Sequence, residues 1–381
     1  MPIYKMAGAK RDGLQKYRVI VNYTERGQKK RVERLVYGKA QAENAEAEIR
    51  AGINRKAPAE QRDREKDLTL RELLALYEKE RGPEIRATTL AKKKSVLNAH
   101  AMPKLGAVKL RDLTPSLLAG WRSELNAEPL KTATKNGAFR ELRALLNFAA
   151  ERGLLPGKPM QGMKPFRDPY RETAAARLRY YTKEEFTRFL DAARAAAERR
   201  DDLRAWGIYM FFVLAVYTGA RKGEINALRW TDIEKDRLRI RRSVTQKLKG
   251  EAWVETPPKT ETSVRTVQMP EKLRTELEAH KRRQKEAGGW SETLFVCGGE
   301  SPIPDTTLEN ANIAFGKAAG LKHITIHEFR HTHASLLCNA GINVKEVARR
   351  LGHADVQITL KTYAHLYPQE EERAAALLDN L

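Results

Sequence analysis

The sequence predicts a multidomain α+β fold, because three successive parts of the 381-residue chain differ in hydrophobic pattern. Residues 1–56 show strand-like alternation followed by helical spacing, which predicts a small basic sheet with one helix. Residues 68–157 have helical spacing throughout and predict an all-α domain. Residues 177–381 predict a mainly α domain with a small antiparallel sheet. Residues 57–67 and 158–176 are polar or rich in Pro and Gly, as linkers are.

Two strands and a helix are expected in the N-terminal domain. Residues 17–23 alternate apolar and mostly polar side chains, a turn around 26–28 leads into a second strand over 30–37, and a helix follows over about 39–53. Residues 1–40 hold eleven Lys and Arg against three Asp and Glu. One interpretation is a merely solvated basic hairpin. The other is a basic binding face, whose expected side chains are Lys16, Arg18, Lys29, Lys30 and Arg31.

Two apolar stripes define the helical domain. The first comprises Leu70, Leu73, Leu74 and Tyr77, and the second Leu142, Leu145, Leu146 and Ala149. Several lysines of this domain would suit contacts to phosphate groups, although they would suit a solvated surface equally well. They are Lys92, Lys93, Lys94, Lys131 and Lys135.

The third domain begins with a capping box at residues 182–185, which should open its first helix. A buried helix is expected from Ala205 to Tyr217, and Gly219 should end it and present Arg221 at the turn. Residues 237–267 predict a short antiparallel sheet, and the remaining segments predict helices.

The last segment, residues 369–381, is acidic and amphipathic. Its apolar stripe needs a groove, which either this domain or a neighbouring protomer could supply.

Composition favours a polyanionic partner such as DNA. The formal net charge is +22, as expected of a protein that displaces counterions from nucleic acid, although charge alone fits any basic protein. The two cysteines, Cys297 and Cys338, are far apart in sequence, which suits a reducing cytosol and provides no metal or disulfide framework. The longest apolar run, residues 210–217, is too short to span a bilayer. We therefore expect a cytoplasmic protein that does not enter the membrane.

A set of side chains in the third domain suits attack on a phosphodiester by a phenol. Two guanidiniums could hold the phosphate oxygens and neutralise the charge that builds in the transition state. A tyrosine, with an ordinary pKa near 10, would need a base or an electropositive site to attack. His327 or His353 could be that base or an additional hydrogen-bond donor to the phosphate. The candidates are Arg221, Lys259, His327, Arg330, His353 and Tyr363.

In their order along the chain, these motifs resemble the tyrosine recombinases, specifically the integrases of temperate phages and integrative conjugative elements. The family's first arginine box is similar to Thr-Gly-Ala-Arg-Lys-Gly-Glu, which gives Arg221 and its acidic partner Glu224. The hairpin lysine of the family matches Lys259, at the start of a Lys-Thr-x-x-Ser-x-Arg run. This resemblance assigns Lys259 as the acid that protonates the departing sugar oxygen.

The remaining motifs carry the resemblance through the last third of the chain. The His-x-x-Arg box matches His327 and Arg330, the Leu-Gly-His box ends at His353, and Tyr363 follows ten residues later as the nucleophile. No catalytic position departs from the family pattern. The resemblance extends over nearly the whole chain, so it implies an arm-type DNA-binding domain, a core-binding helical domain and a catalytic domain.

The resemblance also implies the reaction and the partners. The nucleophile would form a 3′-phosphotyrosyl intermediate that needs no cofactor, neither metal nor nucleotide. Double-stranded DNA with core and arm attachment sites would be the substrate, a homotetramer would act on it, and an excisionase and a host DNA-bending protein would be accessory factors. A resolvase of the Xer type or a type IB topoisomerase would share the catalytic residues, but the additional basic domain favours an integrase.

One competing motif has a different meaning. His327 and His331, with Glu328 between them, satisfy the His-Glu-x-x-His pattern of zinc proteases, for which His333 or His353 could be nominated as a third ligand. Zinc would leave the arginines, the lysine and the tyrosine without a role. We therefore expect no metal, and we expect Glu328 and His331 only to flank the catalytic pair.

Overall fold

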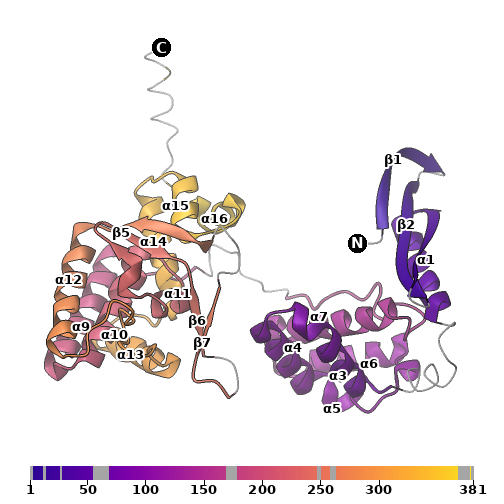
Figure 1. Cartoon of the computed structure of the whole chain (residues 1–381), viewed down its shortest axis with the longest axis horizontal. Coiled ribbons are helices and arrows are strands. Elements are labelled where there is room, and N and C mark those ends of the chain that lie inside the picture. The colour runs from indigo at the N-terminus through magenta and orange to yellow at the C-terminus, as the bar shows by residue number, and fades with distance from the viewer. Residues whose placement is uncertain are drawn as a thin grey trace. The chain divides into compact units, whose positions relative to one another are not determined.

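The computed structural model describes residues 3–11, 14–25, 28–54, 68–168, 178–246, 250–257 and 263–367, together with Leu378. The chain forms two compact units, residues 1–170 and 171–381, shown with their elements in Figure 1. The mainly helical α+β fold expected from the sequence is confirmed. Within the described residues, no helix is long and apolar enough to cross a membrane.

The first unit begins with a sheet that contains one more strand than expected. Strands β1 (Ile3–Arg11), β2 (Leu14–Glu25) and β3 (Gln28–Tyr37) form an antiparallel sheet in that order, followed by helix α1 (Lys39–Asn54). Val19 and Val21 of β2 are buried with Ala42, Ala45 and Ile49 of α1. Alternate side chains of β2 therefore face the helix, and the others form the opposite, open face of the sheet.

The strand register places most of the predicted basic residues on that open face. Arg18 lies opposite Leu35, and Lys16 lies opposite Tyr37, in phase with each other and out of phase with Val19. Arg31, opposite Asn22, belongs to the same face. Lys30 lies opposite Tyr23, in phase with Val19, so its register position is on the other face. Of Lys29, whose side chain is outside the described part, only the pairing with Thr24 is defined.

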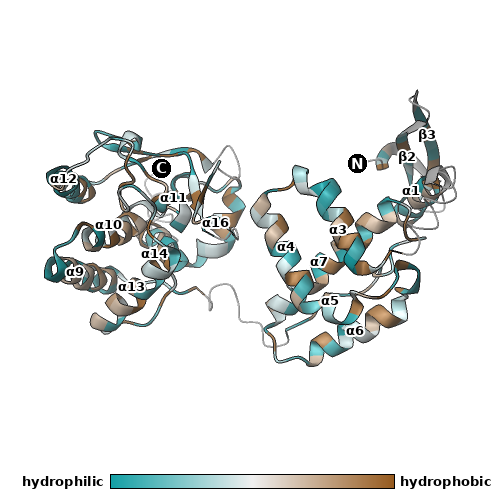
Figure 2. Cartoon of the chain, turned by 60° about the horizontal axis from the view of Figure 1, so that its bottom comes forward, coloured by the Kyte–Doolittle hydropathy of each residue, from teal (hydrophilic) through white to brown (hydrophobic). Residues whose placement is uncertain are grey.

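A helical bundle follows in the same unit. It comprises α3 (Leu70–Arg81), α4 (Ala87–His100), α5 (Met102–Leu105), α6 (Pro115–Ala127) and α7 (Thr132–Glu151), with short 3₁₀ turns at Gly82–Glu84 and Leu110–Asp112. Thr69 and Glu72 form a capping box at the start of α3. The predicted apolar stripes provide the core, in which Leu70, Leu73 and Leu142 are fully buried. Figure 2 shows apolar residues concentrated on one side of α7.

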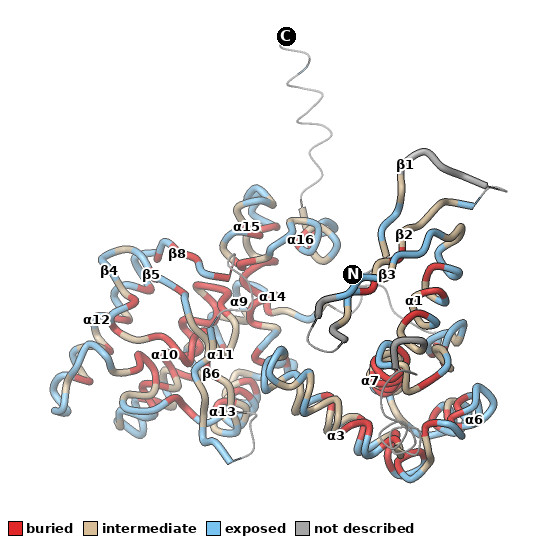
Figure 3. Tube along the Cα trace, turned by 45° about the vertical axis from the view of Figure 1, so that its right-hand side comes forward, coloured by how far each residue is buried: buried red, intermediate tan, exposed pale blue. Residues whose placement is uncertain are grey.

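The second unit is organised around one buried helix. Helix α10 (Leu203–Thr218) packs against α9 (Lys183–Arg200), α12 (Glu271–Glu286) and α14 (Ile326–Asn339). Twelve of the 16 residues of α10 are buried, and the helix is mostly red in Figure 3. The predicted capping box at Thr182 opens α9, and α13 (Asp305–Ala318) completes this layer.

Short strands and C-terminal helices complete the second unit. Helix α11 (Lys222–Asn226) and the 3₁₀ turn η3 (Trp230–Asp232) lead into a sheet of β4 (Ile233–Glu234), β5 (Arg237–Ile240) and β8 (Arg265–Gln268). Strands β6 (Ser243–Thr245) and β7 (Val254–Thr256) form a separate two-stranded sheet, whereas one sheet was expected. Helices α15 (Val344–Leu351) and α16 (Val356–Tyr363) and the turn η5 (Ala364–Leu366) follow. Except for Leu378, the predicted amphipathic tail lies outside the described residues.

Candidate active site

The predicted catalytic residues of the second unit come from neighbouring elements. Arg221 is the N-cap residue of α11, and α14 carries His327 and Arg330. His353 follows Gly352, which ends α15, and Tyr363 is the last residue of α16. Helices α14, α15 and α16 pack against one another, and α10, which packs against both α11 and α14, brings the Arg221 turn to them (Figure 1).

The turn after α10 holds one of the two arginines. Gly219 ends α10 with φ +62°, a left-handed conformation that glycine adopts at little cost. Its carbonyl oxygen accepts a hydrogen bond from Nη1 of Arg330 at 3.0 Å. A β-carbon at this position would lie 2.6 Å from the ring of His333, so the close approach also requires glycine. Gly219 therefore allows α14 to pack closely enough for Arg330 to reach the turn.

Arg330 is a buried cation with an unused donor. Its exposed fraction is 4%, and its Nη2 atom has no hydrogen-bond partner among the described residues. Burial, followed by the charges of the nearby Arg221 and Arg265 guanidiniums, lowers the pKa of Arg330 to about 9. The side chain is still charged at neutral pH. A buried donor next to other cations is the arrangement that an anion would satisfy.

Glu224 fixes the other arginine. Its Oε1 atom lies 2.7 Å from Nη1 of Arg221, and its Oε2 atom lies 2.8 Å from Nη2 of Arg265. Although burial alone would raise the pKa of Glu224, the charge and hydrogen bond of Arg265 and then Arg221 hold that pKa below its usual range. Glu224 is therefore an anion that orients Arg221.

Arg265 was not singled out in the sequence, although it ends the Lys-Thr-x-x-Ser-x-Arg run. Its Nε atom donates to the carbonyl oxygen of Arg350 at 2.6 Å, and its Nη1 atom to that of Ser263 at 3.2 Å. Together with the bond to Glu224, these contacts join β8 to α11 and to the end of α15, two residues before Gly352. Arg265 thus connects the first arginine box to the turn that carries His353.

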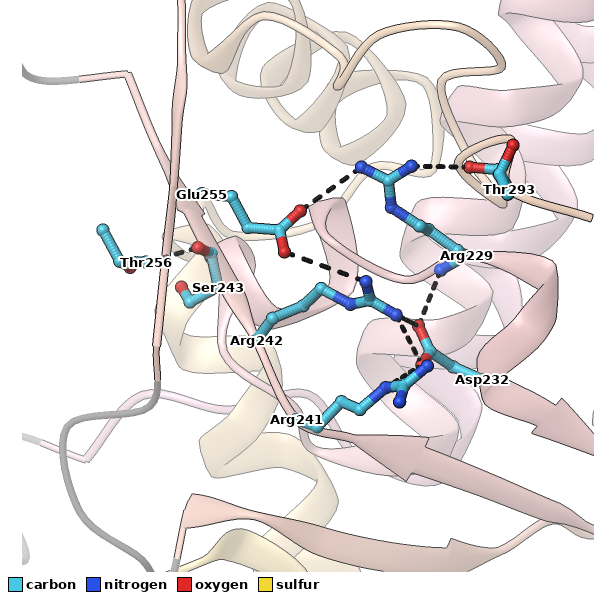
Figure 4. Close-up of polar contacts among 8 residues, drawn as sticks. All are labelled: Arg229, Asp232, Arg241, Arg242, Ser243, Glu255, Thr256 and Thr293. Carbon is cyan, nitrogen blue, oxygen red and sulfur yellow. Dashed lines mark hydrogen bonds and ion pairs between the residues drawn. The ribbon is translucent and has the colours of Figure 1, made fainter.

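A second ionic network holds the strands that precede the predicted lysine. Asp232, which is 1% exposed, accepts a hydrogen bond from Nη2 of Arg242 at 2.7 Å and another from the backbone N–H of Arg229 at 3.0 Å (Figure 4). Glu255 of β7 pairs with Arg229 at 3.3 Å and with Arg242 at 3.8 Å. These contacts fasten β7 to η3. Lys259 itself lies outside the described residues, so its role as acid stays a prediction.

The two predicted histidines are neutral at pH 7. Nδ1 of His353 lies 2.8 Å from Oγ1 of Thr359, and desolvation, followed by the charges of Arg330 and Arg221, lowers the pKa of His353 to about 4. Desolvation and the same two arginines also lower the pKa of His327. Each neutral imidazole has one N–H to donate and one nitrogen to accept a proton.

Tyr363 is buried, and its partner was not foreseen. The phenol oxygen lies 2.5 Å from Nδ1 of His331, a residue that we expected only to flank the catalytic pair. Burial raises the pKa of the Tyr363 phenol, and the Arg330 charge offsets part of that rise. A spacing of four residues from His327 on one helix was the available signal, because it places His331 on the same face of α14.

The zinc hypothesis gains no support from this geometry. The rings of His327 and His331 are 5.3 Å apart edge to face, and within the described residues no group of three or more His, Cys, Asp and Glu is arranged to hold a metal ion. Glu328, the expected general base of that hypothesis, instead accepts the backbone N–H of Thr325 at 2.5 Å in a capping box.

The predicted lysines of the helical bundle differ in accessibility. Lys92 and Lys131 are exposed. Lys135 donates to the carbonyl oxygen of Asn126 at 2.6 Å, and Lys94 pairs with Glu78 at 2.7 Å. Lys93 is buried, with its Nζ atom 2.8 Å from Glu141 and 5.0 Å from the centre of the Tyr77 ring. A phosphate contact would require Lys93 to leave these partners, so the structure does not favour it.

The chain matches families and relatives among known proteins. Residues 179–370 match the model of the phage integrase family, and residues 69–126 match the N-terminal SAM-like domain of phage integrases. The chain is 26% identical to the ICEBs1 integrase of Bacillus subtilis over 88% of this chain and 89% of that protein. It is 27% identical to a XerC-like tyrosine recombinase of Caldanaerobacter subterraneus over 97% of each.

Solved structures share the fold. The Tn1549 transposon integrase in complex with transposon right end DNA superposes with a TM-score of 0.65 at 20% identity, over 81% of this chain and 98% of that one. A lambda integrase dimer bound to a core site superposes with a TM-score of 0.57 at 20% identity, over 97% and 95%. With the family model matched across the unit that carries the tyrosine, the histidines and both arginines, the chain belongs to the phage integrase family of site-specific tyrosine recombinases.

Proposed function

We propose that this enzyme is an integrase that cuts and rejoins double-stranded DNA through Tyr363. The observation that carries the proposal is the unused Nη2 donor of buried Arg330, in the same site as the Tyr363 phenol and the Arg221–Glu224 pair. A DNA phosphate would supply the missing acceptor and the missing negative charge. Arg221, Arg330 and His353 would hold its non-bridging oxygens, where charge builds as the phenol attacks.

The proposed reaction keeps the phosphodiester's energy in a protein–DNA bond. A bond forms between the phenol oxygen of Tyr363 and phosphorus, and the bond from phosphorus to the 5′-oxygen breaks. Lys259 protonates the departing oxygen, and His327 assists proton transfer. The 5′-hydroxyl of a partner strand then attacks the phosphotyrosine and releases the tyrosine. No step oxidises or reduces any group, so the reaction needs no reactant other than DNA and the protein's side chains.

The assembly and the outer contacts belong to the same proposal. Two duplexes exchanged strand by strand require four protomers, hence a homotetramer on DNA. The open face of the N-terminal sheet, with Lys16, Arg18 and Arg31, would contact arm sites, and Lys92 and Lys131 would contact the core site. The integrase would act in the bacterial cytosol or nucleoid, and an excisionase and a DNA-bending protein would set direction. Purified enzyme that recombines both directions at full rate would remove the need for them.

A recombination assay tests this function. Purified enzyme in EDTA would be incubated with supercoiled plasmid carrying DNA from both sides of the gene's own locus and with a linear partner. We expect joint molecules from wild type and none from Tyr363→Phe. Wild-type activity that disappears in EDTA and returns with zinc would contradict the proposal.

A resolvase is the second candidate, because the XerC-like relative matches over 97% of this chain. A resolvase would recombine two copies of one site in a single circle and would not need arm DNA. Removal of two basic charges from the open face of the N-terminal sheet, by Lys16→Ala and Arg18→Ala, should abolish integration if the enzyme is an integrase. Undiminished recombination between short core sites would favour the resolvase.

A further inference from the structure

The phenol of Tyr363 has one ring nitrogen within hydrogen-bond distance. Nδ1 of His331 is 2.5 Å from the phenol oxygen, with the ring centres 5.7 Å apart and tilted by 54°. His331 lies in the first half of α14, one turn after His327, and Tyr363 ends α16. The contact is therefore fixed by the packing of two helices, and it does not depend on a long flexible side chain.

The other two histidines of the site have different neighbours. Nδ1 of His353 is engaged with the Thr359 hydroxyl at 2.8 Å. His327 contacts the His331 ring edge to face, with 5.3 Å between ring centres. Within the described residues, His331 is the imidazole whose nitrogen reaches the attacking oxygen.

The groups around His331 keep its ring neutral. Desolvation and the adjacent His327 lower the pKa of His331 to about 4, and Arg330 acts in the same direction, while Glu328 opposes it. His353, from the turn after α15, is close enough for His331 to contribute to the lowering of its pKa. A neutral ring that accepts from the phenol at Nδ1 carries its proton on Nε2, so Nδ1 presents a lone pair to the phenol.

We propose that His331 is a catalytic residue that accepts the proton of Tyr363 as the phenol attacks phosphorus. This inference rests on the proposed role of Tyr363 as nucleophile and assigns the base for its proton to His331, in place of His327 or His353. The phenol proton moves to Nδ1 while the bond from oxygen to phosphorus forms. On rejoining, the same proton returns to the phenol as the phosphotyrosine is broken.

A bound phosphate would improve His331 as a base. Without DNA, the nearby Arg330 charge disfavours protonation of the ring. A phosphate paired with Arg330 and Arg221 adds negative charge close by, which offsets these cations and stabilises an imidazolium. The proton affinity of His331 therefore rises when substrate is in place.

The test measures the single-turnover rate of covalent adduct formation for wild type, His331→Gln and His331→Ala. His323→Gln is the matched control, because His323 is exposed in the loop before α14. We expect unchanged DNA binding, adduct formation about 10²- to 10⁴-fold slower in both His331 variants, and control rates like wild type. The rate of His331→Gln should rise about tenfold per pH unit above pH 7 as hydroxide replaces the base, and added imidazole should accelerate His331→Ala.

A second substrate shows whether His331 acts as the base, as an acid or only in a structural role. With sulfur in place of the 5′-bridging oxygen, the leaving group needs no proton, so this substrate should restore a variant that lacks the acid and should not restore the His331 variants. If the sulfur substrate restored the rate of adduct formation in the His331 variants, the inference would be overturned. A His331→Gln rate equal to or above that of wild type would also overturn it, because the contact would then only hold Tyr363 in an inactive position. An absent wild-type adduct would instead contradict the function proposed for Tyr363.

Discussion

Replacing Glu224 by Gln should destabilise the second unit strongly, because it removes the one carboxylate shared by Arg221 and Arg265. Arg265 has a side chain that is 3% exposed, so the change leaves a buried guanidinium without its counter-ion. Breaking a buried pair in this way costs about 3–5 kcal/mol. The loss in free energy of unfolding should lie near the lower end of this range, since Arg265 still donates to the carbonyl oxygens of Arg350 and Ser263.

The matched control is Glu346→Gln, whose partner Arg349 lies 2.6 Å away in an exposed pair of the same unit. Exposed pairs contribute about 0.2–1 kcal/mol. Urea unfolding can be followed by fluorescence, because Trp206, Trp230, Trp253 and Trp290 belong to this unit and only Trp121 to the other. At about 2–3 kcal/mol per molar urea, Glu224→Gln should lower the midpoint by roughly 1 M or more. Equal shifts for the two variants would refute the assigned role of Glu224.

Three further predictions concern the same unit. Gly219→Ala should destabilise the protein more than Gly320→Ala. Both glycines have positive φ, so each alanine costs about 1–2 kcal/mol in backbone strain, but only the β-carbon at position 219 would clash with a neighbour, His333. Equal urea midpoints for the two variants would contradict this. Arg330→Lys should bind DNA nearly as well as wild type yet form adduct about 10²- to 10³-fold more slowly, because lysine lacks the two-pronged donor; an unchanged rate would argue against phosphate contact. Burial lowers the pKa of His280 to about 4 and that of His333 to about 3, so the unfolded chain binds more protons than the folded chain below pH 6.5. The free energy of unfolding should therefore fall from pH 6.5 toward pH 4, by up to about 1.4 kcal/mol per pH unit for each histidine. A constant melting temperature between pH 7.5 and 5 would disagree.

Local sequence signals predicted much of the second unit. The capping box at Thr182 opens α9, and Gly219 ends α10 as expected. Such signals are strong because each depends on a few adjacent residues. Strand β1 was missed because its Ala-Gly-Ala centre interrupts the alternation that marks strands. The division of β6 and β7 from the other sheet depends on long-range pairing, which no local pattern records.

In the site too, local motifs predicted which residues take part, but not the contacts that depend on how distant elements pack. Motif spacing nominated Arg221, Arg330 and Tyr363, which lie in the same unit. The four-residue spacing from His327 indicates that His331 lies on the same face of α14, but it could not show that the phenol meets this face, because the contact is set by how α16 packs against α14. Nor could it distinguish Lys93, which is buried against Glu141, from the exposed Lys92 beside it.

The most direct test of the account is to identify the amino acid that becomes linked to DNA. Enzyme would be trapped on a nicked core-site duplex in EDTA, the adduct digested with nuclease and protease, and the peptide carrying a nucleotide sequenced by mass spectrometry. We predict the nucleotide on Tyr363, joined through a 3′-phosphate, and no adduct from Tyr363→Phe. A nucleotide on another residue, or an adduct that persists in Tyr363→Phe, would contradict it.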